Sequence, residues 1–171
     1  MRQLLIALLF ATPLAAQDAH EIAFDALEGG TFTLGDFPGQ TLLVVNTASF
    51  CAYTRQYEGL QALDDARDDV TVIGLPTDDF GGQEYDSGAE VADFCDAMFG
   101  ITFPMSDIVR TRGGGAHPFF AWAEAQGGRE AVPRWNFHKW IIDADGRLVA
   151  SLPTRVTPGS SSIAEALDSA R

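Results

Sequence analysis

The sequence TLLVVNTASFCAYTRQY, residues 41–57, changes its pattern at one cysteine and decides the fold class. Thr41–Val45 is β-branched or apolar throughout, which favours a strand covered on both faces, as in a parallel sheet. Residues 46–49 are small and polar, as a turn from a strand into a helix requires. From Thr54 onward, apolar residues recur at helical spacing. We therefore expect a buried strand that carries Cys51 to the start of a helix.

The position of Cys51 suggests a reactive thiol. Unpaired backbone N–H groups and the positive end of the helix dipole favour a thiolate over a thiol at the start of a helix. The alternative is a small buried hydrophobic residue, which is the commoner role of a cysteine taken at random. The rest of the chain has to decide between these two interpretations.

Length and composition indicate one globular domain. The chain has 171 residues, of which 46% are hydrophobic and 20% are charged. Its formal net charge is -13 and Lys139 is its single lysine, which argues against nucleic acid or an anionic membrane as a partner. After the N-terminal region, no apolar stretch is long enough to be transmembrane. We expect the domain to be a monomer.

Residues 1–19 predict a secretory signal peptide. Arg2 precedes the apolar run LLIALLFATPLAA, which is too short to span a bilayer and ends in small residues. We expect cleavage between Ala15 and Ala19, which leaves a mature domain over 20–171. Export places this domain in the periplasm or outside the cell.

The remaining chain alternates strand and helix patterns that are separated by turn residues. In order, the predicted elements are a hairpin of 21–27 and 31–34, a strand over 70–75, a helix over 87–100, a helix over 117–125, a hairpin of 137–142 and 147–152, and a helix over 161–170. This order predicts an α/β protein with a thioredoxin-like fold. An N-terminal β-hairpin would precede a central mixed sheet that is flanked by helices on both faces.

Three polar segments are expected to meet near Cys51, because each is expected to end a strand at the same edge of the sheet. They are NTASFCAYT, LPTDDFGGQE and RWNFHKW. The second and third contribute Gln83, Trp135 and Asn136, whose side chains are neutral hydrogen-bond donors. Such donors stabilise a thiolate without pairing it to a counter-charge.

The same segments make the chain resemble the glutathione peroxidase family. The family pattern Asn-x-Ala-Ser-x-Cys-Gly-x-Thr-x-Gln-Tyr is matched by residues 46–57, Phe-Gly-x-Gln-Glu by 80–84, and Trp-Asn-Phe-x-Lys-Phe by 135–140. The resemblance covers roughly residues 20–155. It implies a cysteine peroxidase without a cofactor, in which Cys51 attacks the peroxide and Gln83, Trp135 and Asn136 complete the catalytic tetrad.

The resemblance also implies a role for Cys95. In family members that use thioredoxin instead of glutathione, a resolving cysteine lies in the helix after the Gln-Glu motif, within a Phe-Cys pair ahead of a Phe-Pro pair. Here these pairs are 94–95 and 103–104. The implied cycle forms a Cys51 sulfenic acid and then a Cys51–Cys95 disulfide, which a thioredoxin-like protein or glutathione reduces. If the two cysteines lie apart, the helix over 87–100 has to unwind locally. The alternative is a core cysteine on the apolar face of that helix.

Several departures from the family pattern lie near the expected site. Ala52 replaces the glycine after the cysteine, and Thr77 replaces the family's third cysteine. Because the implied resolving cysteine is a different one, the change at Thr77 does not exclude peroxidase activity. Asp78 and Asp79 add negative charge, which would disfavour the Cys51 thiolate if the two carboxylates point inward.

Other functions are less well supported by the sequence. His20, His117 and His138 have no ligand spacing, so we expect no metal site, and we expect His138 on the surface of a strand. A thiol:disulfide oxidoreductase or copper-delivery protein would need Cys-x-x-Cys, or Cys-x-x-x-Cys with a partnered histidine, and the chain has neither. The second hypothesis is a non-catalytic periplasmic binding or stress protein of the same fold. In it, Cys51 and Cys95 would form a permanent structural disulfide, as an oxidising compartment permits.

Overall fold

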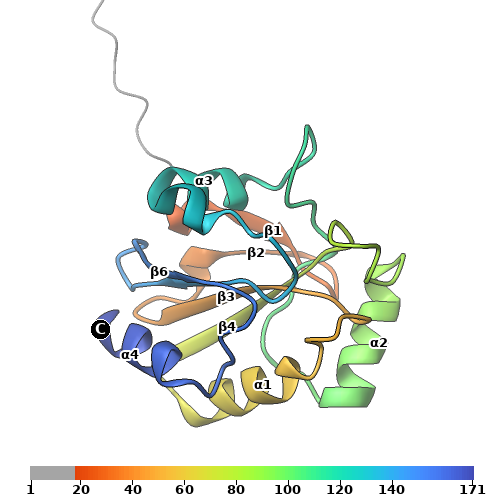
Figure 1. Cartoon of the computed structure of the whole chain (residues 1–171), viewed down its shortest axis with the longest axis horizontal. Helices are drawn as coiled ribbons and strands as arrows, with labels where there is room; N and C mark the ends of the chain where they lie inside the picture. The colour runs from red at the N-terminus through yellow and green to blue at the C-terminus, as the bar shows by residue number, and fades with distance from the viewer. Residues whose placement is uncertain (1–17) are drawn as a thin grey trace, which may run out of the picture.

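The computed structural model describes residues 18–171 and has a four-stranded sheet at its centre (Figure 1). The expected signal peptide and its cleavage site lie almost wholly outside the described residues. The strand order is β4-β3-β5-β6, with β3 at Thr41–Thr47, β4 at Val70–Pro76, β5 at Lys139–Ile142 and β6 at Leu148–Leu152. β3 pairs parallel with β4 and antiparallel with β5, so the predicted mixed sheet is confirmed.

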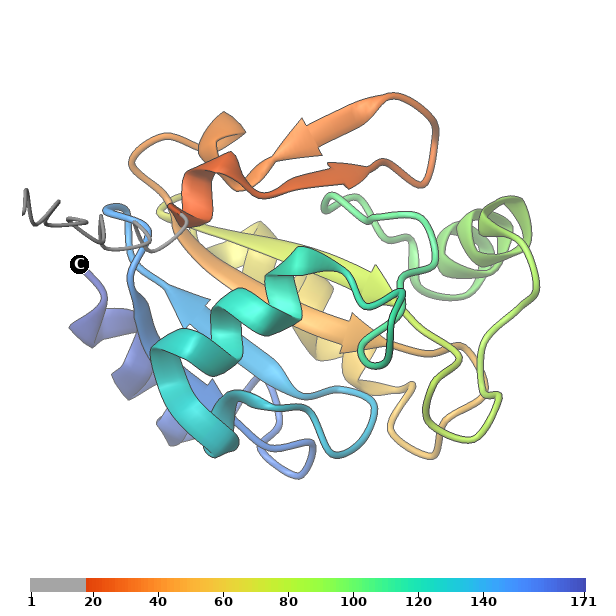
Figure 2. The same cartoon turned by 90° about the horizontal axis from the view of Figure 1, so that it is seen from above.

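Helices cover both faces of this sheet, as predicted (Figure 1). One face packs against α1 (Gln56–Ala66), α2 (Gly88–Phe99) and α4 (Ser161–Ser169). The other face packs against α3 (Pro118–Gly127) and the antiparallel hairpin of β1 (Ala23–Asp25) and β2 (Thr31–Thr33). Figure 2 shows the hairpin alongside the β4 edge of the sheet. Short 3-10 helices at Ala19–Glu21, Leu34–Asp36 and Gly128–Ala131 complete the described elements.

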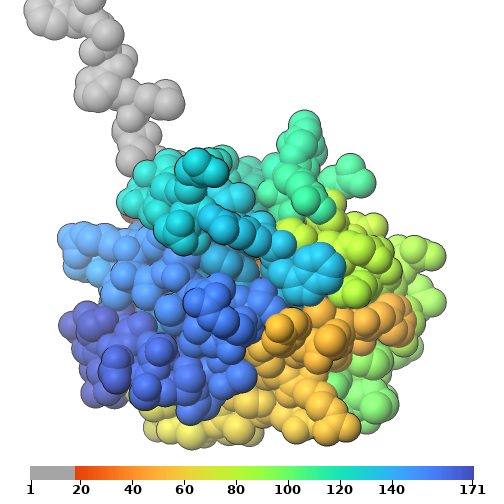
Figure 3. Space-filling model, viewed as in Figure 1, coloured from red at the N-terminus to blue at the C-terminus, as the bar shows by residue number. Residues whose placement is uncertain are grey.

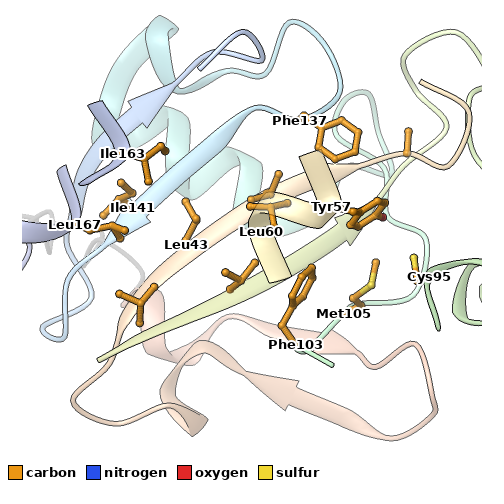
Figure 4. Packing of buried hydrophobic residues seen from close by; sticks show 14 of the residues in the cluster. Leu43, Tyr57, Leu60, Cys95, Phe103, Met105, Phe137, Ile141, Ile163 and Leu167 are labelled. Atoms are coloured by element: carbon orange, nitrogen blue, oxygen red, sulfur yellow. The ribbon is translucent and has the colours of Figure 1, made fainter. Parts of the chain in front are cut away.

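The central strand β3 is buried at all seven positions. Successive side chains of a strand point to opposite faces, so Leu43 and Val45 join the core beneath α1 while Leu42 and Val44 join the core beneath α3. Figure 4 shows the first of these cores, in which Leu43, Leu60 and Ile141 pack together. The continuous apolar pattern of this strand therefore reflects burial on both faces.

The predicted element boundaries hold to within a few residues. α2 lies between the predicted limits, because the Ser87 side chain caps it by accepting a hydrogen bond from the Glu90 N–H, and it ends at Gly100 in a left-handed conformation with φ 58°. α1 begins at Gln56 and not at Thr54. β5 begins at Lys139 and not at residue 137, because Phe137 has φ 61° and cannot continue a strand.

The described residues contain neither a membrane-spanning helix nor a cluster of metal-binding side chains. None of the helices within residues 18–171 is both long enough and apolar enough to cross a membrane. In the same residues, no three histidine, cysteine, aspartate or glutamate side chains gather as a metal site would require.

Candidate active site

Cys51 lies in the loop that follows β3, and its side chain is 8% exposed. The loop is held by Thr54, whose hydroxyl accepts from the Cys51 N–H at 3.0 Å and donates to the Ala48 carbonyl at 2.8 Å. The Tyr53 N–H donates to the Cys51 Sγ at 3.5 Å. Since α1 begins only at Gln56, a turn N–H contacts the sulfur, whereas the sequence predicted the first turn of the helix.

Gln83 and Asn136 meet beside this loop. The Asn136 Nδ2 donates to the Gln83 Oε1 at 3.1 Å, and the Phe50 N–H donates to the Gln83 carbonyl at 2.9 Å. Gly81 and Gly82 adopt φ values of 88° and 62°, a conformation that glycine tolerates and that lets the chain turn sharply into Gln83. The Gln83 oxygen is occupied by Asn136, which leaves the Gln83 amide NH₂ as the donor of that side chain.

The third segment reaches the same edge by a different route from the one expected. Residues 135–138 precede β5 instead of ending a strand, but β5 is antiparallel to β3, so its start lies at the edge where β3 and β4 end. Figure 3 shows the result at the surface, where the orange chain near residue 50, the yellow-green chain near residue 80 and the light-blue chain near residue 135 meet. The predicted convergence of the three segments is therefore present.

Trp135 lies at the exposed side of this meeting point. Its side chain is 40% exposed, and its ring centroid is 6.1 Å from that of Phe80. Phe50 and Tyr53 are also exposed and belong to the Cys51 loop. The site thus has an aromatic rim, while Asn136 is fully buried beneath it.

Cys95 lies in α2 and is only 2% exposed. α2 packs against the Cys51 loop, because the ring centroids of Phe50 and Phe94 are 6.3 Å apart. Cys95 faces the apolar core beside Tyr57 (Figure 4). Burial raises the pKa of the Cys95 thiol to about 11, so this group is a thiol at neutral pH. Both cysteines are free, and no disulfide joins them.

Two carboxylates near the site, those of Asp79 and Glu84, accept hydrogen bonds from backbone N–H groups. The Asp79 Oδ2 accepts from the Thr111 N–H at 2.6 Å and from the Thr111 hydroxyl at 2.9 Å, so this carboxylate is bound by Thr111. Glu84 was not singled out from the sequence, although it ends the Phe-Gly-x-Gln-Glu pattern. It is buried, and its Oε1 accepts from the Ser49 N–H at 3.2 Å, which ties the Cys51 loop to the Gln83 segment. Burial raises the pKa of the Glu84 carboxyl.

The prediction that His138 lies on the surface is wrong. The side chain is buried, and its Nε2 is 2.7 Å from the Ser151 Oγ. Burial lowers the pKa of His138 to about 4, so the ring is neutral at pH 7. The prediction assumed regular strand alternation from residue 137, and the left-handed backbone of Phe137 breaks that alternation.

Lys139, the single lysine of the chain, is fully buried. Its Nζ donates to the Phe137 carbonyl at 2.7 Å, and burial lowers the pKa of the amine from 10.5 to about 7. Between pH 7 and pH 10.5 the Lys139 amine is protonated in the unfolded chain but largely neutral in the folded protein. The contribution of Lys139 to the free energy of unfolding must therefore rise with pH between these two values.

Replacing Lys139 with methionine is therefore expected to flatten this part of the pH dependence. Urea unfolding of both proteins at pH 7 and pH 9 measures it, and the stability of the wild type relative to Lys139→Met should increase at the higher pH. No other lysine can contribute to the difference. If the two proteins keep a constant difference in free energy of unfolding between these pH values, the proposed titration of buried Lys139 is wrong.

Comparison with known proteins identifies the family. Residues 19–124 match the family profile of glutathione peroxidase. The hydroperoxy fatty acid reductase gpx1 of Synechocystis sp. is 38% identical over 148 residues, which make up 81% of this chain and 88% of that protein. The glutathione peroxidase homolog BsaA of Halalkalibacterium halodurans is 38% identical over 144 residues, or 81% of this chain and 91% of that protein.

Solved structures agree with this relationship. The apo crystal structure of Trgpx has 27% sequence identity and a TM-score of 0.69, and the match covers 90% of this chain and 97% of that chain. The crystal structure of T. cruzi GPX1 has the same fold, with a TM-score of 0.65 over 87% of this chain and 92% of that chain, at 24% identity. The chain therefore belongs to the glutathione peroxidase family and is a peroxidase of that type with a thioredoxin-like fold.

Proposed function

We propose that the chain reduces hydrogen peroxide or organic hydroperoxides through a sulfenic acid on Cys51. The observation that carries this proposal is the Asn136–Gln83 hydrogen bond of 3.1 Å, which fixes two amide groups from distant segments beside the loop that holds Cys51. In the proposed step, the Cys51 thiolate attacks one peroxide oxygen. A sulfur–oxygen bond forms as the oxygen–oxygen bond breaks, and the departing hydroxide or alkoxide takes up a proton.

The neutral donors matter because thiolate formation alone supplies little rate. A thiol with a pKa of about 8.5 is roughly 3% ionised at pH 7, and a pKa of about 6 would raise that fraction about thirtyfold. The same change lowers the intrinsic nucleophilicity by about tenfold or more, so the net gain is only a few-fold. Stabilising the negative oxygen that leaves is more effective, and fixed N–H donors do this in the manner of an oxyanion hole. We assign this role to Gln83, Asn136 and the indole of Trp135.

Resolution of the sulfenic acid is assigned to Cys95. Its thiolate would attack the Cys51 sulfur, hydroxide would leave, and a disulfide would form that a dithiol reductant returns to two thiols. Because Cys95 is buried in α2 and is a thiol at rest, we propose that α2 opens locally to expose and ionise it before this step. The boundaries at Ser87 and Gly100 give the segment that would unwind.

The surroundings of Cys95 favour a protein dithiol over glutathione as the reductant. Cys95 lines a groove of about 500 Å³ between α2 and the N-terminal hairpin. Three carboxylate residues, Glu28, Asp93 and Asp96, also line this groove and would repel the anionic tripeptide. A relative in Chlamydomonas reinhardtii, 32% identical over 151 residues, is named a glutathione peroxidase-like peroxiredoxin. We further propose, from residues 1–19, that the protein acts after export in defence against oxidative stress.

Comparing two reducing systems tests the proposal. Peroxide consumption by the mature protein should be sustained with a thioredoxin system and slow with glutathione and glutathione reductase, with Cys51→Ser as the blank. Consumption equal to the blank in both systems, together with no reactive thiol after mild reduction, would favour the non-catalytic protein with a structural disulfide. Faster turnover with glutathione would contradict only the assignment of the reductant.

A further inference from the structure

The turn that presents Trp135 and Asn136 is fastened at three consecutive carbonyl groups. The Asn46 Nδ2 donates to the carbonyl of residue 135 at 3.1 Å, and the Thr154 hydroxyl donates to that of residue 136 at 2.8 Å. The Lys139 Nζ donates to that of residue 137 at 2.7 Å. These donors come from β3, from the segment after β6 and from β5. We call Asn46, Thr154 and Lys139 the carbonyl clamp.

The backbone that the clamp holds is one that a side chain other than glycine seldom adopts. Phe137 has φ 61°, and it is the one non-glycine residue with positive φ among residues 18–171. Such a conformation persists when its surroundings over-determine it. Here the Phe137 N–H donates to the Asn46 carbonyl at 2.6 Å, and the Phe137 ring packs edge-on against Tyr57 at 5.5 Å. The turn is thus fixed at its backbone and at its side chain.

The conformation of this turn decides where the Asn136 amide points. Asn136 is fully buried and spans the gap to Gln83, so a rotation of its peptide would withdraw the Nδ2 from the Gln83 Oε1. The hydrogen bond of Lys139 to Phe137 lies immediately after Asn136, and that of Thr154 lies on Asn136 itself. Burying a lysine amine in a core lowers the stability of the fold unless the amine is hydrogen-bonded. The Lys139 amine meets this requirement by donating to the turn, at the Phe137 carbonyl.

We propose that Lys139, Thr154 and Asn46 are positioning residues that aim the Asn136 amide at Gln83 and thereby set the rate at which Cys51 is oxidised by peroxide. This inference rests on the function proposed above, in which Asn136 stabilises the leaving oxygen. The clamp residues act through Asn136 and touch neither peroxide nor sulfur. Their loss should therefore slow the peroxide reaction while leaving the intrinsic reactivity of the Cys51 thiol unchanged.

The first test compares Thr154→Val with Thr154→Ser in a single turnover. Valine keeps the shape but lacks the hydroxyl, whereas serine keeps the donor. We expect oxidation of Cys51 by hydrogen peroxide to slow about tenfold in Thr154→Val, as a small misplacement of a catalytic group does, and to recover in Thr154→Ser. Alkylation of Cys51 by iodoacetamide should proceed at the wild-type rate in both. Thr71→Val, at a half-buried threonine near the start of β4, is the matched control for a lost hydroxyl.

The second test asks whether the clamp acts through Asn136. Combining Thr154→Val or Lys139→Met with Asn136→Ala should give no further loss beyond that of Asn136→Ala alone. Losses that multiply, or a slowed alkylation, would overturn the clamp and indicate a general structural defect. If Asn136→Ala slows oxidation but Thr154→Val and Lys139→Met do not, the clamp is wrong and the proposed function stands. If Asn136→Ala itself has no effect, the role of Asn136 in the proposed function fails, and the clamp fails with it.

Discussion

Replacing Cys51 with serine is expected to reduce peroxide consumption to the uncatalysed rate. Serine cannot form the sulfenic acid, and its hydroxyl does not ionise near neutral pH, so both the nucleophile and the product of the first step are lost. The measurement is peroxide decay in the presence of excess dithiol reductant. Within residues 18–171 the Cys51 sulfur accepts a single weak hydrogen bond, from the Tyr53 N–H at 3.5 Å, so the fold should be retained, and thermal unfolding provides the control.

A residual rate in Cys51→Ser would locate the chemistry elsewhere. Cys95 is then the remaining thiol, and the double variant Cys51→Ser, Cys95→Ser would show whether it is responsible. We expect the two variants to be equally inactive, because the buried Cys95 is a thiol at neutral pH and is only 2% exposed.

Replacing Cys95 with serine is expected to have the second largest effect, but on a different step. The first equivalent of peroxide should react at the wild-type rate, since Cys95 is a buried thiol of α2 and is not one of the donors assigned to the peroxide step. Recycling by a dithiol protein should then stop, because the Cys51 sulfenic acid has no partner thiol. Rapid mixing with one equivalent of peroxide, followed by turnover with the thioredoxin system, separates the two steps.

Unchanged recycling in Cys95→Ser would end the resolving role and leave Cys95 as a core residue. Ala92→Ser is a suitable control, because residue 92 lies on the same helix and lines the same groove without a thiol. It should leave both steps unaffected.

Much of the fold could be predicted from the sequence because its core strands carry an unambiguous pattern. Residues 41–45 of β3 are β-branched or apolar, and the whole strand is buried. β4 is buried except at Thr71, which is half-buried. The cap of α2 could be predicted because the Ser87 and Glu90 pair is a local signal. The start of α1 could not, because the hydroxyl of Thr54 is used in the Cys51 loop and delays the helix.

The candidate site could be predicted to the extent that it depends on strand ends. Cys51 and Gln83 follow parallel strands, and Asn136 precedes an antiparallel one, so topology alone brings them to one edge. The burial of His138 and Lys139 could not be predicted, because it follows from the left-handed backbone of Phe137, which no local sequence pattern indicates. The carbonyl clamp depends on contacts across the sheet, such as that between Thr154 and Asn136, and these are visible only in three dimensions.

The claim that Cys51 is the peroxidatic residue is tested most directly by trapping its product. The Cys95→Ser variant would be treated with one equivalent of hydrogen peroxide in the presence of dimedone, and the adduct would be mapped by peptide mass spectrometry. We expect a dimedone adduct on Cys51 and the loss of its alkylation by iodoacetamide. A Cys51 that stays unlabelled and fully alkylatable after the peroxide has been consumed would contradict its peroxidatic role.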